Sequence, residues 1–206
     1  MSPAVKLLSL LEGLEQTGRS RSVIDLVRDG QPLAPWRLYP GVSGLFDRRS
    51  GCQFYCHSQG VDHEAGHIHT VRLFSDHTAH LLAVSLKDDG WPQALFTLNL
   101  WAIGEAHESA ADLGRYARRF HLAERVGPPQ LVRFVNLIFQ VFGREIERLQ
   151  DEKIATLAAQ GVAHPDRDVF EDPSLEVLSR VEIDVRARAR DVVWAVPRCR
   201  TGDKAG

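Results

Sequence analysis

Metal-binding residue types are concentrated in one short stretch of this chain. Six of the nine histidines lie between residues 57 and 80, and Glu64 lies among them. Imidazole and carboxylate groups are ligands that Zn²⁺, Fe²⁺, Mn²⁺ and Ni²⁺ accept. Apolar segments with the composition of strands flank the stretch on both sides. This concentration marks the stretch as a candidate site for a divalent transition metal.

Strand geometry selects four of these residues. Side chains at positions i and i+2 share one face of a strand, so His67 and His69 point the same way. On a preceding strand, His57 can lie opposite this pair, with Cβ atoms about 5 Å apart. Glu64 falls in the turn before His67, and Gly66 allows that turn to fold tightly. The sequence therefore predicts a mononuclear site with the ligands His57, His67, His69 and Glu64.

Further polar residues are candidates for catalysis and substrate binding. Tyr55 lies on the first of the two strands, and Glu105 follows shortly after a later apolar strand. If Glu64 is not a ligand, it can act as the general base. Asn99 and Trp101 share one face of the later strand and are candidate substrate-binding groups. An Asn99 side chain that simply faces water explains its presence equally well.

Two other site types fit the spacing less well. Cys52 and Cys56 form a C-x₃-C pair without a second pair of cysteines, which is not the pattern of a structural zinc site. Cys56 and His57 are neighbours in a strand, so their side chains point to opposite faces and do not form a nucleophile–base pair. We therefore expect a set of bystanders: Cys52, Cys56, His63, His77 and His80.

Composition narrows the class of protein. The chain has 206 residues and a net charge of −2, which gives no electrostatic reason to expect a nucleic acid or an anionic membrane as partner. No apolar run reaches the roughly 18 residues of a membrane span, and the first residues lack the basic segment of a signal peptide. Three irregularly spaced cysteines do not form the disulfide framework of a secreted protein. The expected location is cytoplasmic.

Two short helices are predicted at the start of the chain. An apolar stripe at helical spacing predicts the first over 4–16, and Ser22 can cap a second over 21–29. These helices form an N-terminal extension, residues 1–30, which we interpret as a structural lid. A segment rich in proline and glycine, 31–51, then leads into the main domain.

The sheet is predicted from apolar segments that are joined by short connections. Such connections favour an antiparallel meander, and Asp89-Gly90 is a strong hairpin signal. An alternating segment at 175–185 can add an edge strand. The four central strands are expected at 53–58, 67–74, 79–86 and 94–103.

Helical periodicity returns after the sheet. One helix is predicted over 109–120, and a long helix over 130–160 follows a glycine–proline break. The first half of the long helix is apolar almost all round and should lie across the sheet, with a bend at Gly143. The charged second half, 144–153, should project toward solvent or pair with a second copy in a homodimer.

The expected fold class is therefore α+β: an antiparallel sheet of four to five strands packed on a long helix, with an N-terminal helical pair. Residues 31–196 form a single domain. Within it, residues 187–196 fit a strand or a helix equally. Residues 197–206 form a flexible tail.

Four segments within residues 37–155 resemble a known family. They read QFYCHSQ, EAGHIHTVRLF, AHLLAVSLKDDGWPQALFTLNLWAIGE and FVNLIFQVFGREIERL, and they are similar to an uncharacterised bacterial family that carries a domain of unknown function. The resemblance implies the same site but no established activity. The chain departs from the family pattern at Cys56, Gln59 and Ala65, where an aromatic residue and two histidines are expected, which disfavours a binuclear site. The matching positions are Gln53, Tyr55, His57, Glu64, Gly66, His67, His69, Asn99, Trp101 and Glu105.

Two functional hypotheses follow. The first is a small metal-dependent enzyme with a mononuclear His/Glu site that acts on a small-molecule substrate. The metal would serve as Lewis acid, water activator or oxygen binder. The alternative is a non-catalytic structural or protein-interaction module, in which the histidines only order a hairpin.

Overall fold

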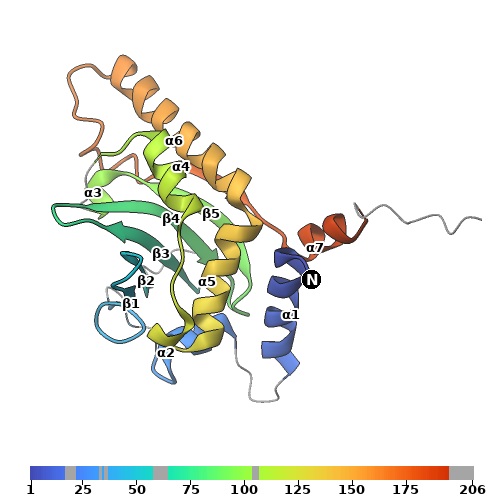
Figure 1. Ribbon diagram of the computed structural model, residues 1–206. Coiled ribbons are helices and arrows are strands. Elements are labelled where there is room, and N and C mark those ends of the chain that lie inside the picture. Colours follow the sequence, from blue (N-terminus) through green and yellow to red (C-terminus); the bar gives the residue numbers. More distant parts are fainter. Residues whose placement is uncertain (17–21, 33, 35–36, 58–64, 104–106, 195–206) are drawn as a thin grey trace, which may run out of the picture.

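Six strands form one antiparallel sheet whose strand order follows the chain, β1-β2-β3-β4-β5-β6. The structure is a computed structural model, and it describes residues 1–206 except 17–21, 33, 35–36, 58–64, 104–106 and 195–206 (Figure 1). The predicted meander is confirmed, with one strand more than expected because β1 pairs with β2 at the edge. The strands are β1 Leu45–Asp47, β2 Cys52–His57, β3 Gly66–Leu73, β4 Thr78–Leu86, β5 Pro92–Leu98 and β6 Val177–Glu182.

Helices cover one face of this sheet (Figure 1). The α+β class is confirmed, including the N-terminal helical pair and the long helical segment on the sheet. α1 packs against α5, and α6 packs along β6 and β5. The helices are α1 Pro3–Gln16, α2 Val23–Arg28, α3 Leu100–Ile103, α4 Ala110–Arg118, the short 3₁₀ helix η1 Glu124–Val126, α5 Pro129–Val141, α6 Gly143–Ala163 and α7 Val185–Trp194.

The alternation of side chains along the strands divides the sheet into two chemically different faces. One face belongs to the main apolar core, where Phe54, Ile68, Val84 and Leu95 pack with the helices. The opposite face carries a much smaller apolar cluster of Ala83, Phe96 and Leu98, and it also carries the histidines. Because successive side chains point to opposite faces of a strand, the apolar residues that fix the core also fix the direction of the histidines.

Local side-chain chemistry sets the ends of several elements. Ser22 and Asp25 form the expected capping box at the start of α2, where the Asp25 amide donates to Ser22 Oγ over 3.2 Å. The strand predicted to continue to residue 103 ends instead at Leu98. The Leu100 amide donates to the side-chain oxygen of Asn99 over 2.8 Å, and the helical turn α3 begins there.

The long helix predicted over 130–160 is interrupted near its middle. α5 ends at Val141 and α6 begins at Gly143, with Phe142 between them at φ −111° and ψ 24°. The Phe142 side chain is buried at this junction, one residue before the bend that the sequence suggests. The undecided segment 187–196 is helical in its described part, within α7.

The second half of the long segment is less exposed than its charge suggests. Ile146 and Leu149 of α6 face the core, and Lys153 lies one turn further with its side chain also buried. The side chain of Thr156 donates to the carbonyl of Leu178 on β6 over 3.0 Å. One side of α6 therefore packs against the sheet, and its charged residues other than Lys153 are exposed or only partly buried.

Candidate metal centre

Three imidazoles gather where β2 and β3 pair on the face of the sheet opposite the helices. His57 on β2 lies directly across from His67 on β3, and Tyr55 lies across from His69. Paired residues in an antiparallel ladder point to the same face, so all four side chains share it. As the alternation of side chains along the strands predicts, the same face carries His57, His67 and His69.

These three rings form a nearly equilateral triangle. The ring centroids lie 4.6 Å apart for His57 and His67, 4.7 Å apart for His57 and His69, and 4.7 Å apart for His67 and His69. One nitrogen of each ring lies within 4.8 Å of the others, and all three side chains are buried. This group can hold a metal ion.

The spacing of the nitrogens fits a tetrahedral ion after a small adjustment. The Nε2 atoms of His57 and His69 are 2.6 Å apart, within hydrogen-bonding distance. Zinc–nitrogen bonds of about 2.0–2.1 Å at tetrahedral angles separate two ligand nitrogens by about 3.3 Å. The two rings would therefore need to separate by less than about 1 Å to accept an ion.

A fourth histidine joins the group from the neighbouring strand. His80 on β4 places its Nε2 2.9 Å from Nδ1 of His69, and its side chain is only 3 % exposed. The expectation that His80 is a bystander is therefore wrong. A metal-bound histidine commonly donates its other ring nitrogen to a partner that fixes its tautomer and orientation. His80 is placed to do this for His69.

A β-bulge explains why the alternation of side chains along β4 did not predict that His80 faces the triangle. Thr70 pairs with Leu82 while Val71 pairs with His80, so Leu81 is an extra residue in β4. The extra residue shifts the alternation by one and turns His80 to the face of His69. Gln150 of α6 donates to the carbonyl oxygen of Leu81 over 2.6 Å, which anchors the bulge to the helix layer.

Burial keeps the rings of His69 and His80 neutral, which for His69 is the form that binds a metal. Burial is the main cause that holds the pKa of His69 well below its ordinary value of 6.5, with further contributions from His80, His67 and His57. Burial, together with the positive charge of Lys153, likewise lowers the pKa of His80 well below 6.5. Both imidazoles are neutral at neutral pH, and neutral imidazole is the metal-ligating species.

Aromatic side chains frame the triangle. The Tyr55 ring stacks on His69 at 4.9 Å between centroids, and the Phe96 ring meets His67 edge-on at 5.5 Å. Tyr55 therefore contacts the site as the sequence predicts, and its catalytic role remains a prediction. Glu64 and Glu105, together with His63, lie outside the described residues.

The two predicted substrate-binding residues lie in a different environment. The side-chain amide of Asn99 donates to the carbonyl of Val169 over 2.8 Å, and the indole N–H of Trp101 donates to the carbonyl of Leu175 over 3.3 Å. Both side chains thus attach the segment between Val169 and Leu175 to the end of β5. Their assignment to substrate binding remains a prediction.

The remaining expected bystanders lie away from the triangle. Cys52 and Cys56 are buried thiols on the core face of β2. His77 bridges two carboxylates, with Nδ1 2.9 Å from Asp76 and Nε2 2.7 Å from Glu108.

The fold and the site together define an α+β protein with a buried group of three imidazoles that can hold a metal ion. The sequence model of a family described as Domain of unknown function (DUF6969) matches residues 3–183, and the chain belongs to this family. The resemblance seen in the sequence is thereby confirmed, over a longer span than residues 37–155. No curated protein matches the chain, and no solved structure matches it. None of the described helices is both long enough and apolar enough to cross a membrane.

Proposed function

We propose that this chain is a small metal-dependent enzyme whose mononuclear centre is held by His57, His67 and His69. The observation that carries the proposal is the triangle of buried rings, with centroids 4.6–4.7 Å apart and donor nitrogens within reach of one ion. Histidines with only a structural role on a sheet do not need to lie close to one another. These three rings direct one nitrogen each toward a common point.

The number of ligands among the described residues supports a catalytic rather than a structural metal. Structural zinc sites use four protein ligands, and catalytic sites use three and leave a position for water or substrate. Three imidazoles suit Zn²⁺, Fe²⁺ and Ni²⁺, and a carboxylate would add Mn²⁺ to these. In the proposal Glu64 is the general base, or it is a fourth ligand to an ion such as Fe²⁺ or Ni²⁺ that keeps further coordination positions open. Tyr55 and Glu105 assist proton transfer. A bound metal would act as Lewis acid, water activator or oxygen binder on a small molecule.

One observation favours the alternative of a non-catalytic module. The nitrogens of His57, His69 and His80 are already joined by contacts of 2.6 and 2.9 Å. A chain of hydrogen bonds between neutral imidazoles can order these strands without any ion. The two proposals therefore differ in whether the purified protein holds a metal.

Metal analysis of protein made without a histidine tag separates the two proposals. After reconstitution with Zn²⁺, Fe²⁺, Ni²⁺ or Mn²⁺ and desalting, we expect about one equivalent of metal in the wild type. His67→Ala and His69→Ala should each fall to less than about a tenth of an equivalent, because two imidazoles hold an ion poorly. His121→Ala removes an exposed histidine elsewhere and should keep the wild-type content. A wild-type protein with less than about a tenth of an equivalent of every metal would exclude the metal centre.

A second measurement tests whether the centre is open. Co²⁺ substituted into the site should give visible bands typical of tetrahedral cobalt, and added azide should shift them in a saturable way. Such a shift requires a coordination position that the protein does not fill. Bands that azide leaves unchanged would mean a closed, structural site, and the enzymatic proposal would then be wrong.

A further inference from the structure

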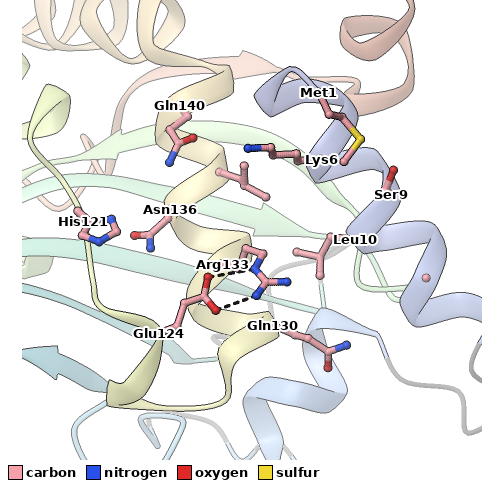
Figure 2. Close-up of a pocket in the computed structure, with 12 residues that line it drawn as sticks. Met1, Lys6, Ser9, Leu10, His121, Glu124, Gln130, Arg133, Asn136 and Gln140 are labelled. Carbon is pink, nitrogen blue, oxygen red and sulfur yellow. Dashed lines mark hydrogen bonds and ion pairs between the residues drawn. The ribbon is translucent and has the colours of Figure 1, made fainter.

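A groove crosses the solvent-facing side of the helix layer, far from the histidine triangle. Figure 2 shows α5 as its floor, α1 as one wall and the segment 121–124 as the other. Its volume is about 640 Å³, which lies within the range of about 300–1,000 Å³ that small-molecule sites occupy. We call this feature, built from α1, α5 and residues 121–124, the α1–α5 groove.

The wall formed by residues 121–124 is held rigidly against α5. Asn136 of α5 accepts a hydrogen bond from the Leu122 amide over 3.0 Å and donates to the Leu122 carbonyl over 2.8 Å. Asn136 and Leu122 are both buried. A buried side chain that satisfies both backbone groups of one residue fixes that residue in place. The groove is therefore formed before any ligand arrives.

The charges in the groove leave the Lys6 ammonium uncompensated. Arg133 pairs with Glu124 through two hydrogen bonds, Nε to Oε1 at 3.1 Å and Nη2 to Oε2 at 2.7 Å. This guanidinium holds the pKa of Glu124 below its ordinary value, so the pair is ionised and its charges cancel. Lys6 is the other lysine or arginine among the described lining residues. Its side chain makes no ion pair within the part of the chain that the structure describes.

Polar donors without a side-chain partner face apolar surface in the same groove. Lys6 and Ser9 lie three residues apart on α1 and so share a helix face, and Gln140 lies on the facing side of α5. Figure 2 shows the Lys6 side chain pointing from α1 toward Gln140. Among the described residues, none of these three side chains forms a hydrogen bond. Leu10 and Leu137 add apolar lining.

We propose that the α1–α5 groove binds a small organic acid. Its carboxylate would be held by the Lys6 ammonium and the Gln140 amide, and its apolar part would lie on Leu10 and Leu137. The uncompensated Lys6 ammonium matches a carboxylate, and a charge-assisted hydrogen bond is the strong kind of polar contact. A small number of placed polar groups on an apolar lining is the usual form of such sites.

This site is independent of the metal centre. α5 packs on the core face of the sheet, where Ile138 and Phe134 join the main apolar cluster. The histidines lie on the opposite face, so the sheet separates the two sites. Loss of metal binding would leave the groove intact, and failure of the groove proposal would leave the metal centre untouched.

NMR titration of the full chain tests the proposal. Benzoate and hexanoate, each with its neutral amide as control, are added to ¹⁵N-labelled protein up to about 20 mM, a range suited to fragment-sized ligands. We expect at least one acid to give saturable shifts of the backbone amides of Lys6, Ser9 and Gln140. The matching amide should bind at least about tenfold more weakly, because it lacks the charge.

Variants assign the shifts to the groove. Lys6→Gln keeps a long polar side chain but removes the charge, and it should weaken binding of the acid about tenfold. Arg144→Gln makes the same change of charge at an exposed position of α6 and should leave the affinity unchanged. The proposal is overturned if neither acid gives saturable shifts, if the amides bind as well as the acids, or if Lys6→Gln binds like the wild type.

Discussion

Nε2 of His80 lies 2.9 Å from Nδ1 of His69, and both buried rings lie on the same face of the paired strands β3 and β4. A metal on Nε2 of His69 requires the proton of that ring on Nδ1, where His80 can accept it. In that tautomer, with His80 as the acceptor, Nε2 of His69 is free to bind the metal.

Replacement of His80 by alanine should weaken metal binding without removing a ligand. We expect the dissociation constant to rise about 10–100-fold, the usual effect of losing the partner of a metal-bound histidine. Competition with a chromophoric chelator measures this change. His80→Gln can still accept the proton and should recover part of the affinity, and His77→Ala, which changes a histidine outside the triangle, should have no effect. Equal affinities in His80→Ala and the wild type would contradict the assigned role.

Gly66 controls how closely β2 and β3 approach beside the triangle. Its φ is +155°, and a Cβ at this position would lie 2.9 Å from the carbonyl oxygen of His57. Gly66→Ala should therefore lower the free energy of unfolding by about 1–3 kcal/mol and reduce metal content by displacing His57. Urea denaturation and metal analysis check the two effects.

A matched glycine serves as the control for this substitution. Gly161 lies within α6, and a Cβ there has no neighbour within 4 Å. Gly161→Ala should raise the free energy of unfolding by about 0.5–1 kcal/mol, because alanine favours the helix. A Gly66→Ala protein as stable as the wild type would show that the strands can move apart at no cost.

Asn136 should contribute to stability well beyond its size. Asn136→Ala leaves both the buried amide and the buried carbonyl of Leu122 without their partner, and each such group costs about 1–3 kcal/mol. We expect the free energy of unfolding to fall by about 2–4 kcal/mol in urea. The exposed Gln140 on the same helix is the control, and Gln140→Ala should change stability by less than about 0.5 kcal/mol. Similar free energies of unfolding for the two variants would show that the Asn136 hydrogen bonds to Leu122 do not stabilise the fold.

The two hydrogen bonds of His77 predict that its contribution to stability depends on pH. Hydrogen bonds that the His77 ring N–H groups donate to Asp76 and Glu108 raise the pKa of His77 above its ordinary value of 6.5. The folded state favours the protonated His77 ring. The contribution of this ring to folding stability is therefore complete below pH 6.5 and is lost as the pH rises through the raised pKa. NMR titration of the ring protons should give a pKa above 6.5, and Glu108→Gln should lower it. A pKa of His77 at or below 6.5 in the wild type would contradict its hydrogen bonds to Asp76 and Glu108.

Several parts of the site could be predicted because they depend on local geometry. His67 and His69 share a face through the two-residue period of a strand, and His57 needs only the pairing of adjacent strands to face them. Tyr55 follows from the same rule. The capping residue Ser22 and the helix it begins also depend on neighbours within four residues.

Other features depended on contacts between distant residues. The sequence suggests a bend at Gly143, and only the structure shows that the long segment breaks into two helices at the buried Phe142. Asn136 sits within an apolar helix, and its partner Leu122 is identified only when the two segments meet. The α1–α5 groove joins segments more than a hundred residues apart in the chain, as Lys6 and Gln140 show.

The amino-acid sequence by itself indicated the α+β class and the meander. It also determined that His67 and His69 share a face, because the period of a strand is a property of its own backbone. The tertiary structure alone decided the role of His80. An extra residue at Leu81 reverses the alternation of β4, and that residue is extra only relative to the pairing with β3. A register between strands is a relation between two segments, so side-chain direction beyond a bulge cannot be read from either segment alone.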